Sequence, residues 1–323
     1  MNIDEEVVKA NEKLGALRDE IGKAIVGQQG MIKSLLIALL CGGHVLLEGV
    51  PGIAKTLAVN TLSKALQLDF KRIQFTPDLL PSDLIGTSVY HPKEGTFSVM
   101  KGPVFSNVIL ADEINRAPPK VQSALLEVMQ EKQVTIAGQT FQTGSPYFVL
   151  GTQNPIEQEG TYPLPEAETD RFMMKVLIDY PKVDEEKEIV LRYSAAIAPK
   201  IEPRMNAEDI FWLREVTRNI YLDEKILNYI VSIVFATRDP AQYQVDISGL
   251  LEYGASPRAS MWLSSASKAH ALLEGRTYVT PFDIKSVAYD ILRHRLVLSY
   301  EAQAEELTAD EIIHKILNTI PVP

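Results

Sequence analysis

The sequence predicts an α/β fold in which helices cover both faces of a parallel sheet, followed by a smaller all-helical domain. Two observations predict this fold class. Continuous apolar runs, typical of strands covered on both faces, alternate with helical patterns as far as Pro181. Beyond Pro181 strand signals disappear and helical patterns follow one another. We therefore expect an α/β domain at residues 1–181 and a helical domain at residues 182–323.

The first elements are predicted to be helices. Residues 4–23 carry apolar side chains at helical spacing with charges between them, and residues 31–40 resume the pattern after an interruption at residues 26–28. A pair of glycines at 42–43 ends the second helix. A third apolar helical face follows at residues 57–66.

The strands are predicted from apolar runs at residues 45–47, 108–111, 147–152 and 174–178. Residues 70–103 are rich in proline and glycine and poor in helix signals. Within them, short β-prone runs on either side of residues 91–95 predict a hairpin, and residues 134–141 predict a second one.

The second domain contains only predicted helices. Asn206, Asp223 and Thr280 are N-cap candidates, and Thr280 is followed by a proline suited to a first helical position. The helices are predicted at residues 184–195, 208–219, 224–237, 257–273, 281–296 and 309–317.

Composition favours a globular protein of a reducing compartment. Hydrophobic residues make up 46% of the chain, and Cys41 is the only cysteine, so no disulfide framework is expected. The first residues lack the basic start and apolar core of a signal peptide, and the apolar stretch at residues 35–40 is too short to span a bilayer. We therefore expect a cytoplasmic protein with no membrane span.

The charge balance argues against nucleic acid as a default partner. Lys and Arg number 32 against 42 Asp and Glu, which gives a net charge of −10 and no block of like charges. Because binding to nucleic acid rests on neutralising phosphates, no nucleic-acid partner is expected. A local basic groove or a basic ring pore remains open.

A candidate phosphate-binding loop follows the run at residues 45–47. A glycine-rich turn leaves backbone N–H groups free to face phosphate oxygens, and the next helix adds the dipole of its N-terminus. Lys55 can reach the β- and γ-phosphates, and Thr56 can ligate Mg²⁺. The candidate contacts are Gly49, Pro51, Gly52, Ile53, Ala54, Lys55, Thr56 and Leu57.

Ala54 departs from the general pattern G-x-x-x-x-G-K-[ST], which has glycine before the lysine. Alanine fits there if its φ stays negative, or if a cost of about 1–2 kcal/mol for a left-handed conformation is absorbed elsewhere. The alternative is a Gly-Pro-Gly turn that joins a strand to a helix, with Lys55 in solvent.

Two acids follow the run at residues 108–111, at the end of a strand where open α/β sheets bind ligands. Asp112 can hold Mg²⁺ through its water shell, and Glu113 can polarise a water for attack on the γ-phosphate. The alternative is an N-cap for the next helix. A phosphate loop after a neighbouring strand favours the catalytic role.

Three further residues complete the candidate site. Asn154 ends the next strand, where it can orient the attacking water or sense the γ-phosphate; the alternative is an Asn-Pro turn. Arg171 precedes the last strand and is either a finger supplied to a neighbour's nucleotide or a solvated arginine. Arg258 opens a helix, where the helix dipole disfavours a cation unless an anion or a carboxylate lies nearby.

In this order, the segments resemble the AAA+ ATPases, and specifically the MoxR family. Residues 49–56 are similar to that family's Walker A, written G-x-P-G-x-A-K-T, so Ala54 agrees with the family. Residues 108–117 resemble Walker B and its continuation. By the same resemblance, Asn154 falls at sensor 1, Arg171 at the arginine finger and Arg258 at sensor 2.

The resemblance covers essentially the whole chain. Residues 25–28 resemble the segment that packs on adenine, which adds Val26 and Gly27 to the nucleotide contacts, and the hairpins resemble the helix-2 and pre-sensor-1 inserts. The family implies a P-loop AAA+ core with a helical lid, ATP and Mg²⁺ as cofactors, and a hexameric ring in which Arg171 acts on the adjacent subunit's ATP. It also implies chaperone-like remodelling of client proteins, often ones with von Willebrand A domains.

Two alternatives remain. Minichromosome maintenance helicases share these inserts, so one alternative is a nucleic-acid-stimulated AAA+ motor, which the acidic net charge disfavours. The other is a nucleotide-gated scaffold with little turnover, which the complete set of Glu113, Asn154 and Arg171 disfavours.

Overall fold

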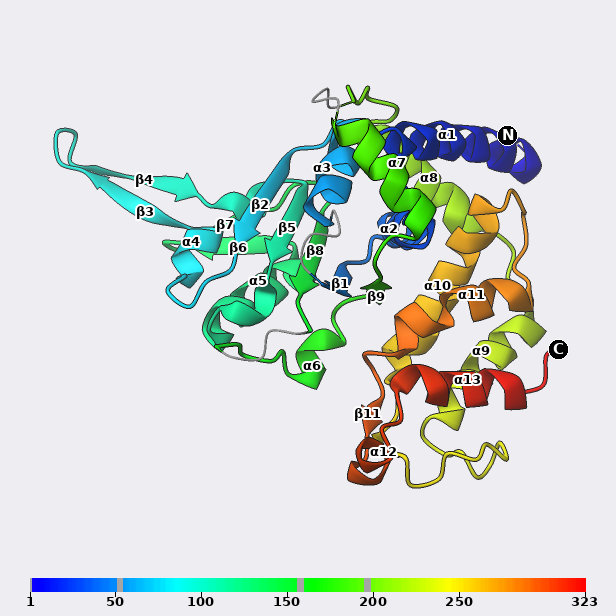
Figure 1. The fold of residues 1–323 in the computed structure, drawn as a ribbon. Helices are drawn as coiled ribbons and strands as arrows, with labels where there is room; N and C mark the ends of the chain where they lie inside the picture. Colours follow the sequence, from blue (N-terminus) through cyan, green and yellow to red (C-terminus); the bar gives the residue numbers. More distant parts are fainter. Residues whose placement is uncertain (1, 51–54, 156–159, 195–198) are drawn as a thin grey trace.

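The computed structural model describes residues 2–50, 55–155, 160–194 and 199–323. Its centre is a parallel sheet with the strand order β2-β5-β8-β1-β9 (Figure 1). The strands are β1 (Val45–Gly49), β2 (Phe70–Gln74), β5 (Val108–Asp112), β8 (Phe148–Gln153) and β9 (Met174–Ile178). The predicted parallel strands are confirmed. The sequence did not predict β2, an edge strand in which Ile73 alone is buried.

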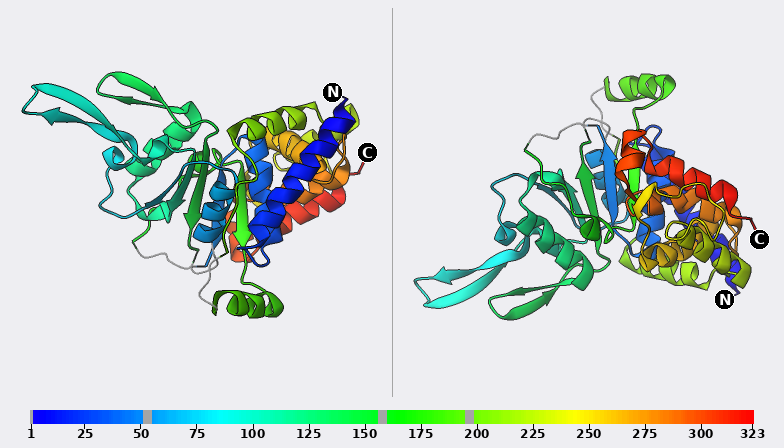
Figure 2. Two further views of the ribbon diagram at one scale, coloured as in Figure 1. Left: turned by 90° about the horizontal axis from the view of Figure 1, so that it is seen from above. Right: turned by 90° about the horizontal axis from the view of Figure 1, so that it is seen from below.

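Helices cover both faces of this sheet, as predicted (Figure 2). Successive residues of a strand point to opposite faces, so in β1 Val45 and Leu47 join one hydrophobic core and Leu46 joins the other. The first core lies under α1 (Ile3–Gly22), α2 (Gln29–Cys41) and α3 (Lys55–Ala65). The second lies under α4 (Pro81–Ile85) and α5 (Pro119–Glu131).

Two antiparallel hairpins extend from the side of the sheet that carries α5 (Figures 1 and 2). The longer pairs β3 (Gly86–His91) with β4 (Thr96–Lys101), and the shorter pairs β6 (Gln133–Ile136) with β7 (Gln139–Gln142). They lie at the positions that the turn signals predict. Short helical turns η1 (Pro103–Phe105) and η2 (Ile114–Arg116) and the helix α6 (Glu166–Thr169) connect the remaining elements.

After the sheet the chain is mainly helical. The helices are α7 (Val183–Ser194), α8 (Ala207–Asn219), α9 (Glu224–Ala236), α10 (Pro257–Leu273), α11 (Pro281–Leu292), α12 (Tyr300–Ala304) and α13 (Ala309–Thr319). A short ribbon of β10 (Leu251–Tyr253) and β11 (Val297–Leu298), which the sequence did not predict, joins them. Helix α11 ends at Leu292, four residues before the predicted 296. The side chains of Arg293 and Arg295, which follow it, donate to the carbonyls of Lys175 and Met173 in the β9 region.

The first core also continues into these later helices, because α1 and α2 pack against α8 and α10. Helix α7 differs from its neighbours: it projects at the margin of the molecule in Figure 2, and none of its residues is buried. It contacts the segment between α1 and α2, where Arg192 and Tyr193 donate hydrogen bonds to the carbonyls of Lys23 and Ala24. Among the described residues, no helix is both long enough and apolar enough to cross a membrane.

Candidate active site

The parallel strands β1, β5 and β8 all end on the same side of the sheet, and we call this side the carboxyl edge. It brings most of the predicted site residues together. Lys55 begins α3, and its Nζ donates hydrogen bonds to the carbonyl of Gly49 at the end of β1 and, at 3.4 Å, to that of Gln153 at the end of β8. Thr56 follows in the first turn of α3 and is partly exposed. The predicted contacts Pro51, Gly52, Ile53 and Ala54 lie outside the described residues.

Burial lowers the pKa of Lys55, and the nearby carboxylates of Asp112, Glu113 and Glu48 oppose that shift. The ammonium therefore lies in a partly desolvated setting and faces negative charge on the same sheet edge. Because a lower local dielectric strengthens charge interactions, such a group binds a phosphate more strongly than a lysine in water does.

The two predicted acids are fixed by a hydroxyl of the adjacent strand. Thr152 Oγ1 donates to Asp112 Oδ1 at 2.6 Å and accepts from the backbone N–H of Glu113 at 2.8 Å. Glu113 has a left-handed backbone, with φ 56°, at a typical cost of about 1–2 kcal/mol. This conformation at the end of β5 and the bond to Thr152 together hold Glu113 beside Asp112. The sequence interpretation did not include Thr152.

Side chains from β2 and η2 also reach these acids. Arg72 Nη2 lies 2.6 Å from Asp112 Oδ2, and Gln74 Nε2 donates to Glu113 Oε2 at 2.7 Å. Arg116 Nε lies 2.9 Å from the same Glu113 oxygen. The sequence missed Arg72 and Gln74 because it missed β2; the rule that site residues gather at the ends of parallel strands would have found Gln74.

Asn154 directly follows β8 and is 8% exposed, at the sheet edge that carries Lys55 and Glu113. The structure therefore brings the predicted Walker A lysine, the two acids and the sensor asparagine to one edge. This arrangement has a cation for phosphate, oxygen ligands suited to a hard divalent ion, and a carboxylate and an amide for a water.

The segment predicted to pack on adenine lies between α1 and α2. Val26 is buried, and Gly27 has φ 65°, a region that favours glycine. The carboxyl group of Glu185 in α7 packs directly on Gly27, where a Cβ would meet it at 2.4–2.7 Å. A cavity of about 580 Å³ adjoins this segment; its lining includes residues from the start of α2, the end of β9, α10 and α11.

Arg171 and Arg258 lie at the opposite ends of the strands, where β1 and β9 begin. The N–H of Met173 donates to the carbonyl of His44, just before β1, so Arg171 stands where β1 and β9 begin. Five residues of strand separate this edge from Lys55, roughly 16 Å at the usual rise. Arg171 and Arg258 line a cavity of about 250 Å³ together with Lys132.

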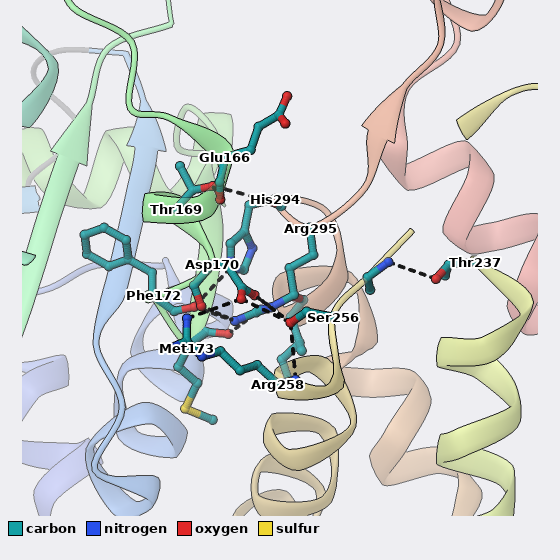
Figure 3. Close-up of polar contacts among 12 residues, drawn as sticks. Glu166, Thr169, Asp170, Phe172, Met173, Thr237, Ser256, Arg258, His294 and Arg295 are labelled. Carbon is teal, nitrogen blue, oxygen red and sulfur yellow. Dashed lines mark hydrogen bonds and ion pairs between the residues drawn. The ribbon is translucent and has the colours of Figure 1, made fainter. Parts of the chain in front are cut away.

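The two arginines differ in their partners. Arg258 Nη1 lies 3.4 Å from Asp170 Oδ2, so the anion expected near this helix start is a carboxylate (Figure 3). Within the described part of the chain, the Arg171 side chain makes no hydrogen bond or ion pair. A partly buried arginine beside a cavity, without a side-chain partner in the described part of the chain, is available to an anion from outside the chain.

Known proteins resemble this chain over nearly all of its length. Residues 44–174 match the family model described as the ATPase family associated with various cellular activities (AAA), and residues 246–316 match an AAA lid domain. Chaperone MoxR1 of Mycobacterium tuberculosis is 48% identical over 94% of this chain and 81% of its own length. Protein MoxR of Paracoccus denitrificans is 32% identical over 93% of each chain.

A solved structure gives the same result for the fold. The crystal structure of a candidate ATPase from Cytophaga hutchinsonii is 51% identical, covers 99% of this chain and 97% of its own, and superimposes with a TM-score of 0.93. The predicted AAA core and lid are confirmed by these matches and by the parallel sheet. The chain is an ATPase and belongs to the MoxR family of chaperone-like AAA+ ATPases.

Proposed function

We propose that this protein hydrolyses ATP at the interfaces of a ring of identical chains, a hexamer by family resemblance, and uses the cycle to remodel or activate client proteins. One observation carries the proposal. The candidate phosphate-binding lysine and the two acids lie where the parallel strands end, whereas the candidate finger Arg171 lies where they begin.

Within one chain, we assign phosphate and metal binding to the loop after β1 and the end of β5. We assign Lys55 to the β- and γ-phosphates, and the other candidate contacts of the loop and the first turn of α3 to the phosphates around it. The oxygen donors present, the Thr56 hydroxyl and the Asp112 carboxylate, suit Mg²⁺, with Asp112 acting through water. The ion would neutralise charge on the phosphates when bound.

Glu113 is assigned as the general base. Gln74 and Arg116 donate to one of its carboxylate oxygens, which fixes the side chain while the other oxygen can accept a proton from water. Asn154 is assigned to the same water or to the γ-phosphate, because it ends the neighbouring strand. Positioning of this kind supplies most of the rate gain in phosphoryl transfer.

Arg171 and Arg258 are assigned to the neighbouring chain's nucleotide. A face that carries the finger and a face that carries the phosphate loop meet when copies associate head to tail, and such contacts close into rings. Arg171 then supplies positive charge to the γ-phosphate, and Arg258 exchanges Asp170 for phosphate oxygens.

The base of the nucleotide is assigned to the cavity beside Val26 and Gly27, whose volume of about 580 Å³ suits a small ligand. The proposal treats residues 1–181 as the nucleotide-binding domain with its two hairpins, and residues 182–323 as the lid. A cytoplasmic location is part of the same proposal.

Client remodelling is inferred from relatives. The M. tuberculosis relative is named a chaperone, and the family resemblance points to clients with von Willebrand A domains. A Glu113→Gln chain held in ATP is the appropriate bait, because it should keep the nucleotide and its client bound. Addition of duplex or single-stranded DNA to the ATPase assay tests the nucleic-acid motor instead.

The proposal is tested by measuring ATP turnover per chain across the concentration at which copies associate, located by light scattering. A site shared between chains predicts turnover that rises steeply with assembly. A turnover per chain that stays constant from dispersed chains to assembled ones would mean that the site is complete in one copy.

A further inference from the structure

We propose that Arg295 is a positioning residue for ATP hydrolysis: it fixes the segment of residues 170–173 to the lid and so sets the place of Arg171. This inference rests on the proposed action of Arg171 on a neighbouring chain. Arg295 follows α11, is 6% exposed, and lies against the 170–173 segment (Figure 3).

Each nitrogen of the Arg295 guanidinium donates hydrogen bonds at the junction between the 170–173 segment and the end of α11. Its Nε donates to Asp170 Oδ1 at 2.7 Å, and its Nη2 donates to the carbonyls of Asp170 at 3.1 Å and Phe172 at 2.7 Å. Its Nη1 donates to the carbonyl of Met173 at 3.1 Å and to that of Ile291 in α11. Five bonds match the five N–H donors of an arginine, a geometry that lysine cannot reproduce.

The charge at this junction is retained at neutral pH. Burial lowers the pKa of Arg295 to about 10, and Asp170 opposes the shift. The guanidinium is therefore still protonated at pH 7. An arginine that is buried yet bonded to one carboxylate and four carbonyls holds its partners firmly, because any displaced carbonyl would lose its bond in a desolvated place.

His294 holds the same segment from the adjacent position. Its Nε2 lies 3.1 Å from the carbonyl of Phe172, and Thr169 Oγ1 donates to the His294 carbonyl at 3.5 Å. Burial lowers the pKa of His294 well below its usual value, with Arg295 adding to the shift. The ring is therefore neutral and donates from Nε2 to the carbonyl.

These bonds fix the backbone on both sides of Arg171. Asp170 and Phe172 are both bound by Arg295, whereas the side chain of Arg171 between them has no partner among the described residues. Asp170 also accepts from Ser256 Oγ at 3.1 Å and pairs with Arg258. The Asp170 carboxylate thus connects the backbone next to Arg171 to two places in the lid, the start of α10 and the end of α11.

No periodicity or motif links these residues, because Asp170 and Arg295 are 125 positions apart. The contacts are unlike a general surface ion pair, since they bind the carbonyls of a loop rather than a single carboxylate. If Arg171 must be placed within about 1 Å to act, loss of these bonds would cost on the order of 10²-fold in turnover.

The test compares Arg295→Gln with Arg295→Lys and with Arg293→Gln. Arg293 is the matched control: it lies two positions away, joins the lid to β9 through the carbonyl of Lys175, and does not touch the 170–173 segment. We expect Arg295→Gln to lower kcat by about 10- to 100-fold while KM and nucleotide affinity change little. Arg295→Lys should recover part of the loss, and Arg293→Gln should turn over like the wild type.

A mixing experiment separates positioning from a general structural role. Chains with Arg295→Gln keep a complete site of their own, so adding Glu113→Gln chains, which supply a well-placed Arg171, should restore turnover. Wild-type kcat in Arg295→Gln, an equal loss in Arg293→Gln, or no recovery on mixing would each overturn the positioning role.

Two comparisons keep the result decisive. If Arg295→Gln does not bind nucleotide, Arg295→Lys replaces it, since lysine keeps the positive charge but cannot make the five bonds; wild-type kcat in Arg295→Lys would contradict the inference. Arg171→Ala, measured in parallel, tests whether Arg171 takes part in hydrolysis at all, on which the positioning role depends. Full turnover by Arg171→Ala would refute the proposed shared site itself, whereas inactive Arg171→Ala beside fully active Arg295→Gln would refute the positioning role alone.

Discussion

Asp112 and Glu113 are adjacent in sequence, but different groups hold them. Asp112 accepts from Thr152 and pairs with Arg72, whereas Glu113 accepts from Gln74 and pairs with Arg116. Two acids of the same type can therefore take separate tasks, because each carboxylate has its own orientation. Their place at the carboxyl end of a strand could be predicted from the sequence. Their partners could not, because hydrogen bonds between strands leave no pattern along the sequence.

The carboxylate of Glu20, outside the candidate site, has a structural role. Glu20 in α1 is 1% exposed and accepts from the N–H of Glu202 at 2.9 Å, from Lys23 at 2.8 Å and from Arg204 at 2.7 Å. The backbone bond from Glu202 and the two cations hold the pKa of Glu20 at about 2, against burial, which raises it. Glu20 thus joins α1 to the segment that precedes α8.

We predict that Glu20→Gln lowers the melting temperature at pH 7 and that the difference from the wild type vanishes in acid. A carboxyl whose pKa is depressed in the folded state adds stability above its ordinary pKa of 4.5 and loses it as pH falls toward 2. Melting curves of both proteins between pH 7 and pH 2 measure this, with the exposed Glu12→Gln as control. A difference that persists unchanged at the acid end would contradict the assignment.

At the scale of elements, the strands that the sequence predicted are those covered on both faces. Val108 to Ala111 are all buried, so β5 reads as a continuous apolar run. The edge strand β2 offers one buried residue, Ile73, and carries Arg72 and Gln74 toward the site instead. The residues that sequence reasoning missed come from such polar strand positions and from long-range contacts like that of Arg295.

Helix α7 meets the α1–α2 junction at a glycine. We predict that Gly27→Ala lowers the free energy of unfolding by about 1–2 kcal/mol, because Gly27 has φ 65° and a side chain is strained there. Glu185, which packs on this glycine, is flexible at its end. Adding Glu185→Ala should therefore recover only a small part of the loss.

Denaturant unfolding measures this prediction, with Gly15→Ala as the matched control. Gly15 lies inside α1 with nothing within 4 Å of an added Cβ, so alanine there should raise stability by about 0.5–1 kcal/mol. A Gly27→Ala protein as stable as the wild type, or one fully rescued by Glu185→Ala, would contradict the backbone explanation.

At the scale of the whole molecule, the candidate site residues lie at the two opposite ends of the parallel strands. One carries Lys55, Asp112, Glu113 and Asn154; the other carries Arg171 and a cavity lined by further cations. The order of these residues along the chain predicted the family. Which edge each occupies followed from the parallel register, since Arg171 precedes a strand and the others follow one.

The central claim is that hydrolysis uses residues from two chains, and mixing two inactive variants tests it most directly. Glu113→Gln alone should lower turnover by about 10²- to 10⁴-fold and Arg171→Ala alone by about 10³- to 10⁵-fold, with nucleotide still bound. In an equal mixture that exchanges freely, about a quarter of head-to-tail interfaces join an intact Glu113 to an intact Arg171. The account predicts recovery of turnover toward that fraction of wild type; a mixture no more active than its separate components at any ratio would contradict it.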